Sequence, residues 1–155
     1  MPLARALLAL LLSAALVDAS APPPLPPGAV HVNSTDALVQ NVGDTSVQRI
    51  VMAAGHYLLS SEISVNRALT IEAEGGGGEV RIDGQQQTRL LYVNAPAILT
   101  LIGLTLVNGH FSNYPGGGAA LVEGGALRLS GCIVANNSAV RARASHVLSG
   151  LIPSS

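Results

Sequence analysis

One stretch of the chain, residues 90–139, contains nearly the same sequence twice. The first copy, LLYVNAPAILTLIGLTLVNG, begins at Leu90, and the second copy, AALVEGGALRLSGCIVANN, begins at Ala119. A shift of 28 residues superimposes Leu99 on Leu127, Leu104 on Cys132, Leu106 on Val134 and Asn108 on Asn136. A period of this size is typical of proteins built from stacked structural repeats. The fold must therefore place equivalent residues of the two copies in equivalent surroundings.

The region before this repeat, from Arg49 to Gly84, is a series of short apolar runs closed by Gly, Asn, Asp or Ser. Apolar residues at every second position, followed by turn residues, are typical of short β-strands. The register extends backwards, because Leu69–Ile71 precedes Leu99–Leu101 by 30 residues. We predict about three coils that each give strands to separate parallel sheets, at residues 57–84, 90–109 and 119–137, with loops 75–78 and 109–118 absorbing the differences in length.

The first residues of the chain, 1–19, have the pattern of a secretory signal peptide. Arg5 supplies a positive charge, Ala6–Val17 is an apolar run, and the small residues up to Ala19 suit cleavage at that point. The apolar run is shorter than the ~20 residues that a membrane-spanning helix needs. We therefore expect an extracellular protein, secreted or at the cell surface, with no membrane span after the signal is removed.

A proline-rich spacer, residues 20–28, separates the signal from the first expected strand at Ala29–Val32. The next residues mark the start of a helix, with Ser34 or Thr35 as the N-cap. Apolar residues on one helical face and Gly43 at the end predict a short helix. We expect this helix to cover the open end of the stacked strands.

The repeat pattern stops after Ala139. The main domain is therefore expected to span residues 29–139, and the tail, residues 140–155, to be irregular or helical. Two explanations of this tail stay open. It caps the last coil, or the chain is a truncated relative of a longer protein, which is the explanation we favour.

Composition excludes several functional classes. Charged residues make up 11% of the chain and the formal net charge is −1, which offers no electrostatic basis for binding nucleic acid. The single cysteine, Cys132, excludes an internal disulfide framework. A cysteine-ligated zinc site is also not expected, because it needs several thiolates.

Four segments together resemble a known superfamily: IVMAAGHY at 50–57, ALTI at 68–71, RIDG at 81–84 and AILTLIGLTLVNG at 97–109. They are similar to the right-handed parallel β-helix superfamily, which includes the pectin-lyase-like proteins. The run GGALRLSGCIVANNSA from Gly124 also resembles the repeats of polymorphic outer-membrane and adhesin-like β-helix proteins. The resemblance covers residues 29–139 and implies an all-β fold, a right-handed parallel β-helix. It implies no single activity, because such folds carry many functions.

In stacked strands, alternate side chains point inwards and outwards. We therefore expect one pair of interior columns from Leu69/Ile71, Leu99/Leu101 and Leu127/Leu129, and another from Val80/Ile82, Leu104/Leu106 and Cys132/Val134. Cys132 is interpreted as a small buried hydrophobic residue rather than a reactive or bridging thiol.

Asp83, Asn108 and Asn136 end equivalent strands and are predicted to form a ladder of corner residues. Asn tolerates the left-handed backbone that a sharp corner needs, and stacked amides hydrogen-bond along the stacking axis.

The outward columns argue against catalysis. They are expected to contain Thr70, Thr100 and Arg128 in one column, and Arg81, Thr105 and Ile133 in the next. A lyase or hydrolase of this superfamily would need clustered carboxylates, and neither column has two. We therefore predict no catalytic residue, no cofactor and no metal site.

Other polar residues are interpreted as surface groups. Glu72, Glu74 and Glu79 flank a glycine run and are expected in a solvated loop. The four histidines show no metal-ligand spacing and are expected at the surface or in turns: His31, His56, His110 and His146.

Two N-glycosylation sequons are present, Asn33-Ser34-Thr35 and Asn136-Asn137-Ser138. Asn33 is the better acceptor candidate because it lies beside a helix start. A glycan on Asn136 would compete with the predicted corner ladder.

Taken together, these features predict a β-helix domain with a structural role or a role in binding carbohydrate or a surface protein. Two alternatives remain: a polysaccharide lyase or glycoside hydrolase relative, intact or degenerate, and a fragment of a larger β-helix protein.

Overall fold

The structure, a computed structural model, describes residues 24–75, 78–112, 116–139 and 147–148. The predicted signal peptide, the first part of the proline-rich spacer and most of the tail lie outside these residues. The described residues form one helix, α1 (Thr35–Gly43), and fifteen short strands. The strands are β1 (Ala29–Val32), β2 (Arg49–Met52), β3 (Gly55–Leu58), β4 (Ile63–Val65), β5 (Leu69–Ala73), β6 (Val80–Asp83), β7 (Leu91–Asn94), β8 (Ile98–Ile102), β9 (Thr105–Val107), β10 (His110–Phe111), β11 (Ala120–Glu123), β12 (Ala126–Ser130), β13 (Ile133–Ala135), β14 (Ser138–Ala139) and β15 (Val147–Leu148).

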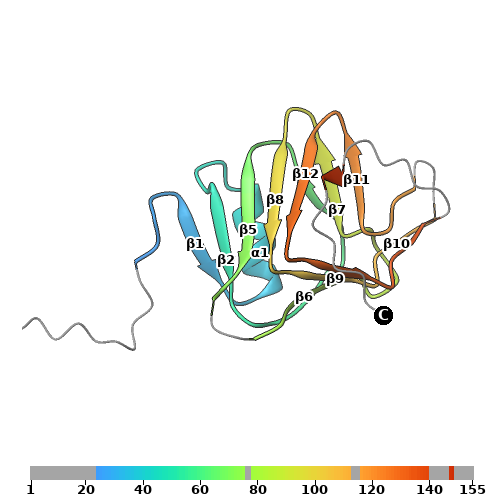
Figure 1. Ribbon diagram of the computed structural model, residues 1–155, viewed down its shortest axis with the longest axis horizontal. Helices are drawn as coiled ribbons and strands as arrows, with labels where there is room; N and C mark the ends of the chain where they lie inside the picture. Colours follow the sequence, from blue (N-terminus) through green and yellow to red (C-terminus); the bar gives the residue numbers. More distant parts are fainter. Residues whose placement is uncertain (1–23, 76–77, 113–115, 140–146, 149–155) are drawn as a thin grey trace, which may run out of the picture.

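The strands pair in parallel and form three main sheets. Sheet A has the order β1-β2-β5-β8-β12-β15, sheet B the order β3-β6-β9-β13, and sheet C the order β4-β7-β11. β10 and β14 form a separate parallel pair. The chain passes through sheets A, B and C in that order three times, as β2-β3-β4, β5-β6-β7 and β8-β9-β11. In Figure 1 the strands of sheet A lie side by side in sequence order, from blue to orange.

The register predicted from the repeat is confirmed. Leu127 pairs with Leu99 in sheet A, and Val134 pairs with Leu106 in sheet B. The earlier offset of 30 residues is also confirmed, since Leu69 pairs with Leu99. Equivalent residues of the two copies therefore occupy neighbouring strands at the same level.

Aliphatic residues of the three sheets fill the space between them. Ile71, Leu101, Ile82 and Cys132 are fully buried at 0% exposure, which confirms the predicted interior position of Cys132. Leu129, also predicted to be interior, is only half-buried. The described part of the next strand, β15, reaches Leu127 and Arg128 but not Leu129, so Leu129 lacks a described neighbour on that side.

The predicted N-terminal helix is confirmed. Ser34 is the N-cap, and its Oγ accepts a hydrogen bond from the Ala37 backbone N–H at 3.2 Å. Leu38 is fully buried, and the helix contacts β1, β2 and β4, which are the first strands of sheets A and C. At the other end, the Arg67 guanidinium donates to the carbonyl oxygens of Val42 and Asp44 at 3.0 and 2.8 Å. A cation at this position also suits the negative end of the helix dipole.

The tail differs from the prediction where it is described. Val147–Leu148 is a short strand that pairs in parallel with Leu127 and Arg128 of β12, rather than an irregular or helical segment. The exposed edge of β12 provides unpaired backbone groups, and a parallel strand satisfies them. The other residues of the tail lie outside the described part of the chain.

The corner after sheet B differs from the predicted ladder of Asp83, Asn108 and Asn136. Asn108 and Asn136 both have the left-handed backbone, with φ of 54°. Asp83, however, pairs with Val107, one residue earlier, and its Oδ2 accepts a hydrogen bond from Asn108 Nδ2 at 2.9 Å.

In the last copy the amide that joins the strands belongs to Asn137, while Asn136 is exposed. Asn137 Oδ1 accepts from the Gly109 N–H at 2.7 Å, and its Nδ2 donates to the Leu106 and Ala135 carbonyls at 3.0 and 2.9 Å. Asn137 thus hydrogen-bonds to three backbone groups at the corner and joins the last two strands of sheet B.

Truncation of Leu101 tests the interior columns. Leu101→Ala should lower the free energy of unfolding by about 2–5 kcal/mol, because it leaves a cavity between the sheets. The matched control is Ile102→Ala in the same strand, where the side chain is 36% exposed and a much smaller loss is expected. Urea unfolding followed by circular dichroism measures both variants, and equal losses would contradict the assigned faces of β8.

Substitution of the two neighbouring asparagines tests the corner. Asn137→Ala should cost about 1–3 kcal/mol, because three backbone groups lose their partner. Asn136→Gly should change stability by less than about 0.5 kcal/mol, since glycine adopts the left-handed backbone freely. Urea unfolding followed by circular dichroism measures both variants. A larger loss of unfolding free energy in Asn136→Gly than in Asn137→Ala would favour the predicted ladder of Asp83, Asn108 and Asn136.

Candidate functional site

The outer face of sheet C has a group of interacting charged and aromatic side chains that we call the Arg89–Tyr92 cluster. It consists of Glu62, Arg89, Tyr92, Phe111 and Glu123. Alternation along β4, β7 and β11 turns Val65, Val93 and Val122 to the interior. The same alternation turns Tyr92 and Glu123 outwards.

Arg89 is the centre of this cluster and is only 3% exposed. Its guanidinium carbon lies 3.8 Å from the centroid of the Phe111 ring and 5.9 Å from that of Tyr92. Its Nη1 atom lies 3.5 Å from Glu62 Oε2. Burial of a cation is costly, so the carboxylate and the electron-rich ring faces offset part of that cost.

Tyr92 and Glu123 are joined by a short hydrogen bond. The Tyr92 hydroxyl donates to Glu123 Oε2 at 2.7 Å, across neighbouring strands of sheet C. This bond raises the pKa of the Tyr92 hydroxyl above its ordinary value. Partial burial and the negative charges of Glu123 and Glu62 raise it further, while Arg89 lowers it in part. Tyr92 therefore stays a neutral hydrogen-bond donor at physiological pH.

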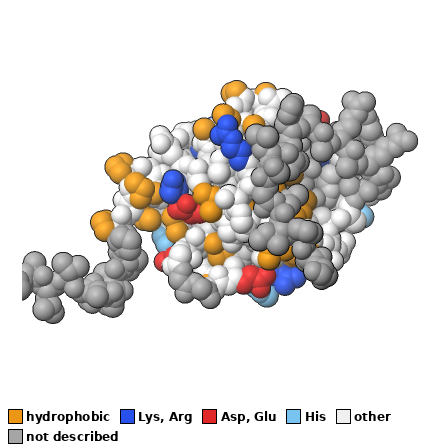
Figure 2. Space-filling model, in the orientation of Figure 1, with side chains coloured by type: hydrophobic (Ala, Val, Ile, Leu, Met, Phe, Trp, Pro, Cys, Tyr) orange, Lys and Arg blue, Asp and Glu red, His pale blue; other side chains and the backbone are white. Residues whose placement is uncertain are grey.

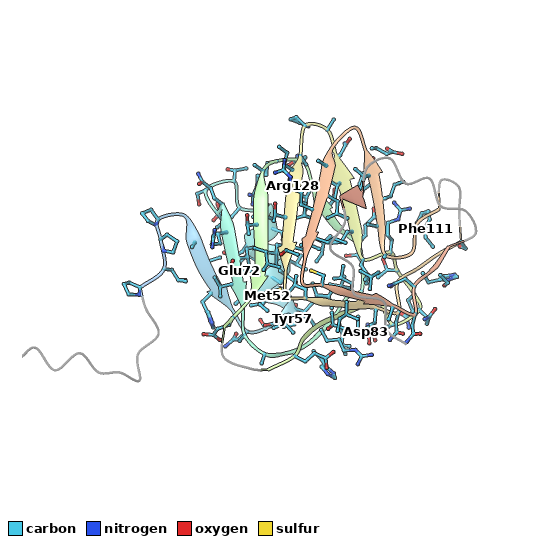
Figure 3. All side chains as sticks on the ribbon, in the orientation of Figure 1. Met52, Tyr57, Glu72, Asp83, Phe111 and Arg128 are labelled. Carbon is cyan, nitrogen blue, oxygen red and sulfur yellow. The ribbon has the colours of Figure 1, made fainter. Side chains whose placement is uncertain are left out.

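Short-range backbone contacts place Phe111 over Arg89. The His110 N–H donates to the Thr88 carbonyl at 2.9 Å, so β10 lies beside the turn that contains Arg89. β10 also pairs with β14, and His110 Nδ1 lies 2.8 Å from Ser138 Oγ. Because side chains alternate along β10, His110 and Phe111 face opposite sides. Figure 3 labels Phe111 at the end of the molecule where β10 lies.

This arrangement suits recognition of a hydroxyl-rich surface. Tyr92 presents a half-buried ring, and the exposed Glu123 carboxylate lies beside its hydroxyl. Rings that carry a polar group are common in sites that combine apolar contact with hydrogen bonding. Among the described residues, no group of three or more His, Cys, Asp or Glu side chains is arranged to hold a metal ion.

The predicted glycosylation residues are both exposed. Asn33 lies at the surface just before α1, as expected. Asn136 is also exposed, and its carbonyl oxygen accepts a hydrogen bond from Gln86 Nε2 at 3.2 Å. Because Asn136 is exposed, the predicted competition between a glycan and a buried corner ladder does not arise at this residue.

Of the three acidic residues near the glycine run, Glu74 and Glu79 lie in the loop between β5 and β6 as predicted, whereas Glu72 differs. Glu72 is in β5 rather than in a loop, and its carboxylate pairs with Arg49 at 3.0 Å. Glu74 lies 3.1 Å from His31 Nε2. In parallel strands, outward side chains at neighbouring levels meet across the sheet, which explains the first pair. Figure 3 labels Glu72 on the face of sheet A.

His31 and His56 are exposed and His110 is half-buried, so all three reach the surface, but each is in a strand rather than a turn. His146 lies outside the described residues.

The predicted outward columns are confirmed as neighbours: Thr70, Thr100 and Arg128 in sheet A, and Arg81, Thr105 and Ile133 in sheet B. Figure 2 shows a face on which charged side chains form a few separate groups between hydrophobic and uncharged surface.

The sequence-based search missed the Arg89–Tyr92 cluster because it compared residues column by column. Tyr92 and Glu123 lie in different strands of sheet C, Glu62 and Arg89 lie outside its strands, and Phe111 comes from a separate strand pair. One signal was available. Arg89 precedes the apolar pair Leu90-Leu91, and an arginine so close to buried positions needs a partner.

No family model matches the chain, and neither the curated proteins nor the solved structures contain a significant match. Within the described residues, no helix has the length and apolar character needed to cross a membrane. Cys132 is a free, buried thiol.

Titration of Tyr92 tests the hydrogen bond to Glu123. Glu123→Gln should lower the pKa of Tyr92 towards the ordinary tyrosine value of about 10, because the charged acceptor is lost. Ultraviolet absorbance of tyrosinate, followed as pH rises, measures the pKa shift. The titration step that is missing in Tyr92→Phe belongs to Tyr92.

The sign of the stability effect follows from the raised pKa. The contribution of Tyr92 is fully present below its unfolded-state pKa and is lost as pH rises through the higher folded-state value. Glu79→Gln removes an exposed carboxylate outside the cluster and is the control for this titration. A titration that is identical in the wild type and in Glu123→Gln would contradict the hydrogen bond.

Proposed function

We propose that this chain is a right-handed parallel β-helix domain that acts outside the cell and binds carbohydrate through the Arg89–Tyr92 cluster. Three observations support the fold: parallel pairing throughout the main sheets, repeated passage through sheets A, B and C, and a register that the sequence repeat predicts. The signal-like pattern of residues 1–19 supports export. The exposed sequon at Asn33 is consistent with the same route.

The observation that carries the binding function is the Tyr92–Glu123 pair held beside a buried arginine. Sugars have apolar C–H faces and many hydroxyl groups, so they contact a ring and a carboxylate together. Arg89, which stacks on Phe111 and is 3% exposed, lies 5.9 Å from the centroid of the Tyr92 ring and gives that ring a fixed neighbour. A preorganised pair loses little conformational entropy when a ligand binds.

The charges of the cluster favour neutral over acidic sugars. The exposed charge belongs to the Glu123 carboxylate, whereas the arginine charge is buried beneath the surface. An anionic sugar would approach a carboxylate without an accessible cation to balance it. We therefore assign neutral glycans as the ligand class.

One observation favours a second candidate, a carbohydrate-active enzyme. The cluster contains two carboxylates: Glu123 accepts a hydrogen bond from the Tyr92 hydroxyl at 2.7 Å, and Glu62 lies 3.5 Å from Arg89 Nη1. Paired carboxylates are the usual machinery of glycoside hydrolysis. Tyr92 itself is unsuited to act as a base near neutral pH, because its raised pKa keeps it protonated.

Binding is tested with the exported chain, residues 20–155, on an array of neutral, amino-containing and acidic glycans, followed by calorimetry with the strongest ligand. Tyr92→Ala should weaken binding about tenfold or more, which corresponds to about 1.4 kcal/mol. Glu123→Gln should weaken it by a similar factor, since hydrogen bonds to charged groups are worth about 1.5–3 kcal/mol. Thr105→Ala, on the outer face of sheet B, is the matched control and should bind normally.

Two outcomes would overturn the carbohydrate-binding function. The first is a folded chain that binds no glycan, and the second is binding that Tyr92→Ala leaves unchanged. Release of reducing ends from the bound glycan, abolished by Glu62→Gln or Glu123→Gln, would favour the enzyme instead.

A further inference from the structure

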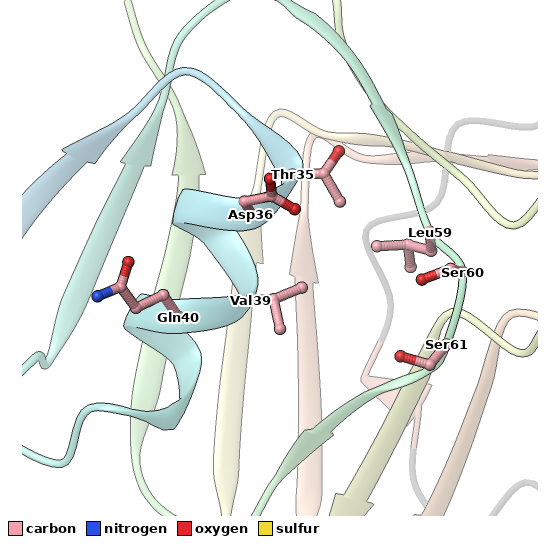
Figure 4. A pocket seen from close by; sticks show the side chains of 7 residues that line it. All are labelled: Thr35, Asp36, Val39, Gln40, Leu59, Ser60 and Ser61. Carbon is pink, nitrogen blue, oxygen red and sulfur yellow. The ribbon is translucent and has the colours of Figure 1, made fainter.

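A cavity lies away from the Arg89–Tyr92 cluster, between α1 and the turn that joins β3 to β4. Its volume is about 290 Å³, close to the lower end of the range for small-molecule sites, about 300–1,000 Å³. Figure 4 shows Thr35, Asp36, Val39 and Gln40 on the helix opposite the turn residues Leu59, Ser60 and Ser61.

The cavity has an apolar part and a polar rim. Two apolar side chains line it: Leu59, which is fully buried, and Val39, which is 48% exposed. The rim provides hydroxyl groups from Thr35, Ser60 and Ser61 and the amide of Gln40. Such a combination fits a small ring with one apolar face and several hydroxyl groups.

Asp36 is the one charged residue in the lining, and its carboxylate is exposed. Within the described part of the chain, neither the Asp36 carboxylate nor the Gln40 amide takes part in a hydrogen bond or ion pair. By contrast, the other helix-end carboxylate, Asp44, accepts a hydrogen bond from Ser46 Oγ at 2.7 Å. The Asp36 carboxylate is therefore available to a ligand.

We propose that this cavity binds a single amino sugar, with its ammonium group on Asp36 and its hydroxyl groups on Ser60 and Ser61. The apolar face of the sugar ring packs on Val39. The only formal charge in the lining is negative, so an ammonium group gains Coulomb attraction and a carboxylate is repelled. The site does not depend on the Arg89–Tyr92 cluster, which belongs to sheet C and β10.

The proposal is tested by titrating the exported chain, labelled with ¹⁵N, with glucosamine, glucose and glucuronic acid. Glucosamine should shift the amide resonances of Gln40, Ser60 and Ser61 with saturation. Glucose should bind about fivefold more weakly or worse, and glucuronic acid should produce no saturable shift. Raising the salt concentration should weaken glucosamine binding, because the attraction to an exposed carboxylate is screened.

Asp36→Asn keeps the shape of the side chain and removes its charge. It should weaken glucosamine binding about fivefold to tenfold and leave glucose binding nearly unchanged. Glu79→Gln removes an exposed carboxylate outside the cavity and is the matched control. Circular dichroism verifies that each variant keeps its fold.

Three results would overturn the proposal: no saturable shift with glucosamine in the folded chain, equal affinity for glucose, or full affinity in Asp36→Asn. Failure of this site is distinguishable from failure of the carbohydrate-binding function, because the two use different residues and are measured with different variants.

Discussion

The structure depends on parallel hydrogen bonding between strands of successive passes through the three sheets. Parallel pairing keeps equivalent residues about 4.8 Å apart, so an interior aliphatic residue packs on its equivalent in the next strand. Leu69, Leu99 and Leu127 show this relation in sheet A. Each strand is too short to be stable alone, and stability comes from stacking neighbours. The helix α1 matters for the same reason, because it covers the first strands of the stack.

Alternation along these strands creates an outer surface whose side chains are placed by the interior. In sheet C, Val93 and Val122 point inwards, and this orients Tyr92 and Glu123 outwards to meet across neighbouring strands. Arg89 adds a constraint of a different kind. A buried guanidinium needs compensation, and Glu62 and Phe111 provide part of it. The buried charge thus links β10, the turn before β7 and the start of β4.

The two candidate binding regions differ in construction. The Arg89–Tyr92 cluster is built on strands and a stacked cation, so its polar groups already contact one another. The cavity beside α1 is bounded by a helix and a turn, and its carboxylate has no partner in the described chain. The proposed ligands differ accordingly: an extended glycan at the cluster, and in the cavity a small molecule that supplies a hydrogen-bond partner and a positive charge.

The sequence by itself determined most strands before residue 139, a short helix that begins at Ser34 or Thr35, the parallel register and the buried position of Cys132. Each of these follows from local pattern or from the repeat, which relates residues at a constant spacing. The tertiary structure alone decided that the Asn137 side chain, rather than that of Asn136, hydrogen-bonds across the last corner. It also decided that Glu72 lies in a strand. Finally, it brought Glu62, Tyr92 and Phe111 close to Arg89. These contacts join residues from different strands or separate segments, at sequence spacings that the repeat does not predict. They depend on side-chain packing and on the compensation of buried charge, which appear only in the folded chain.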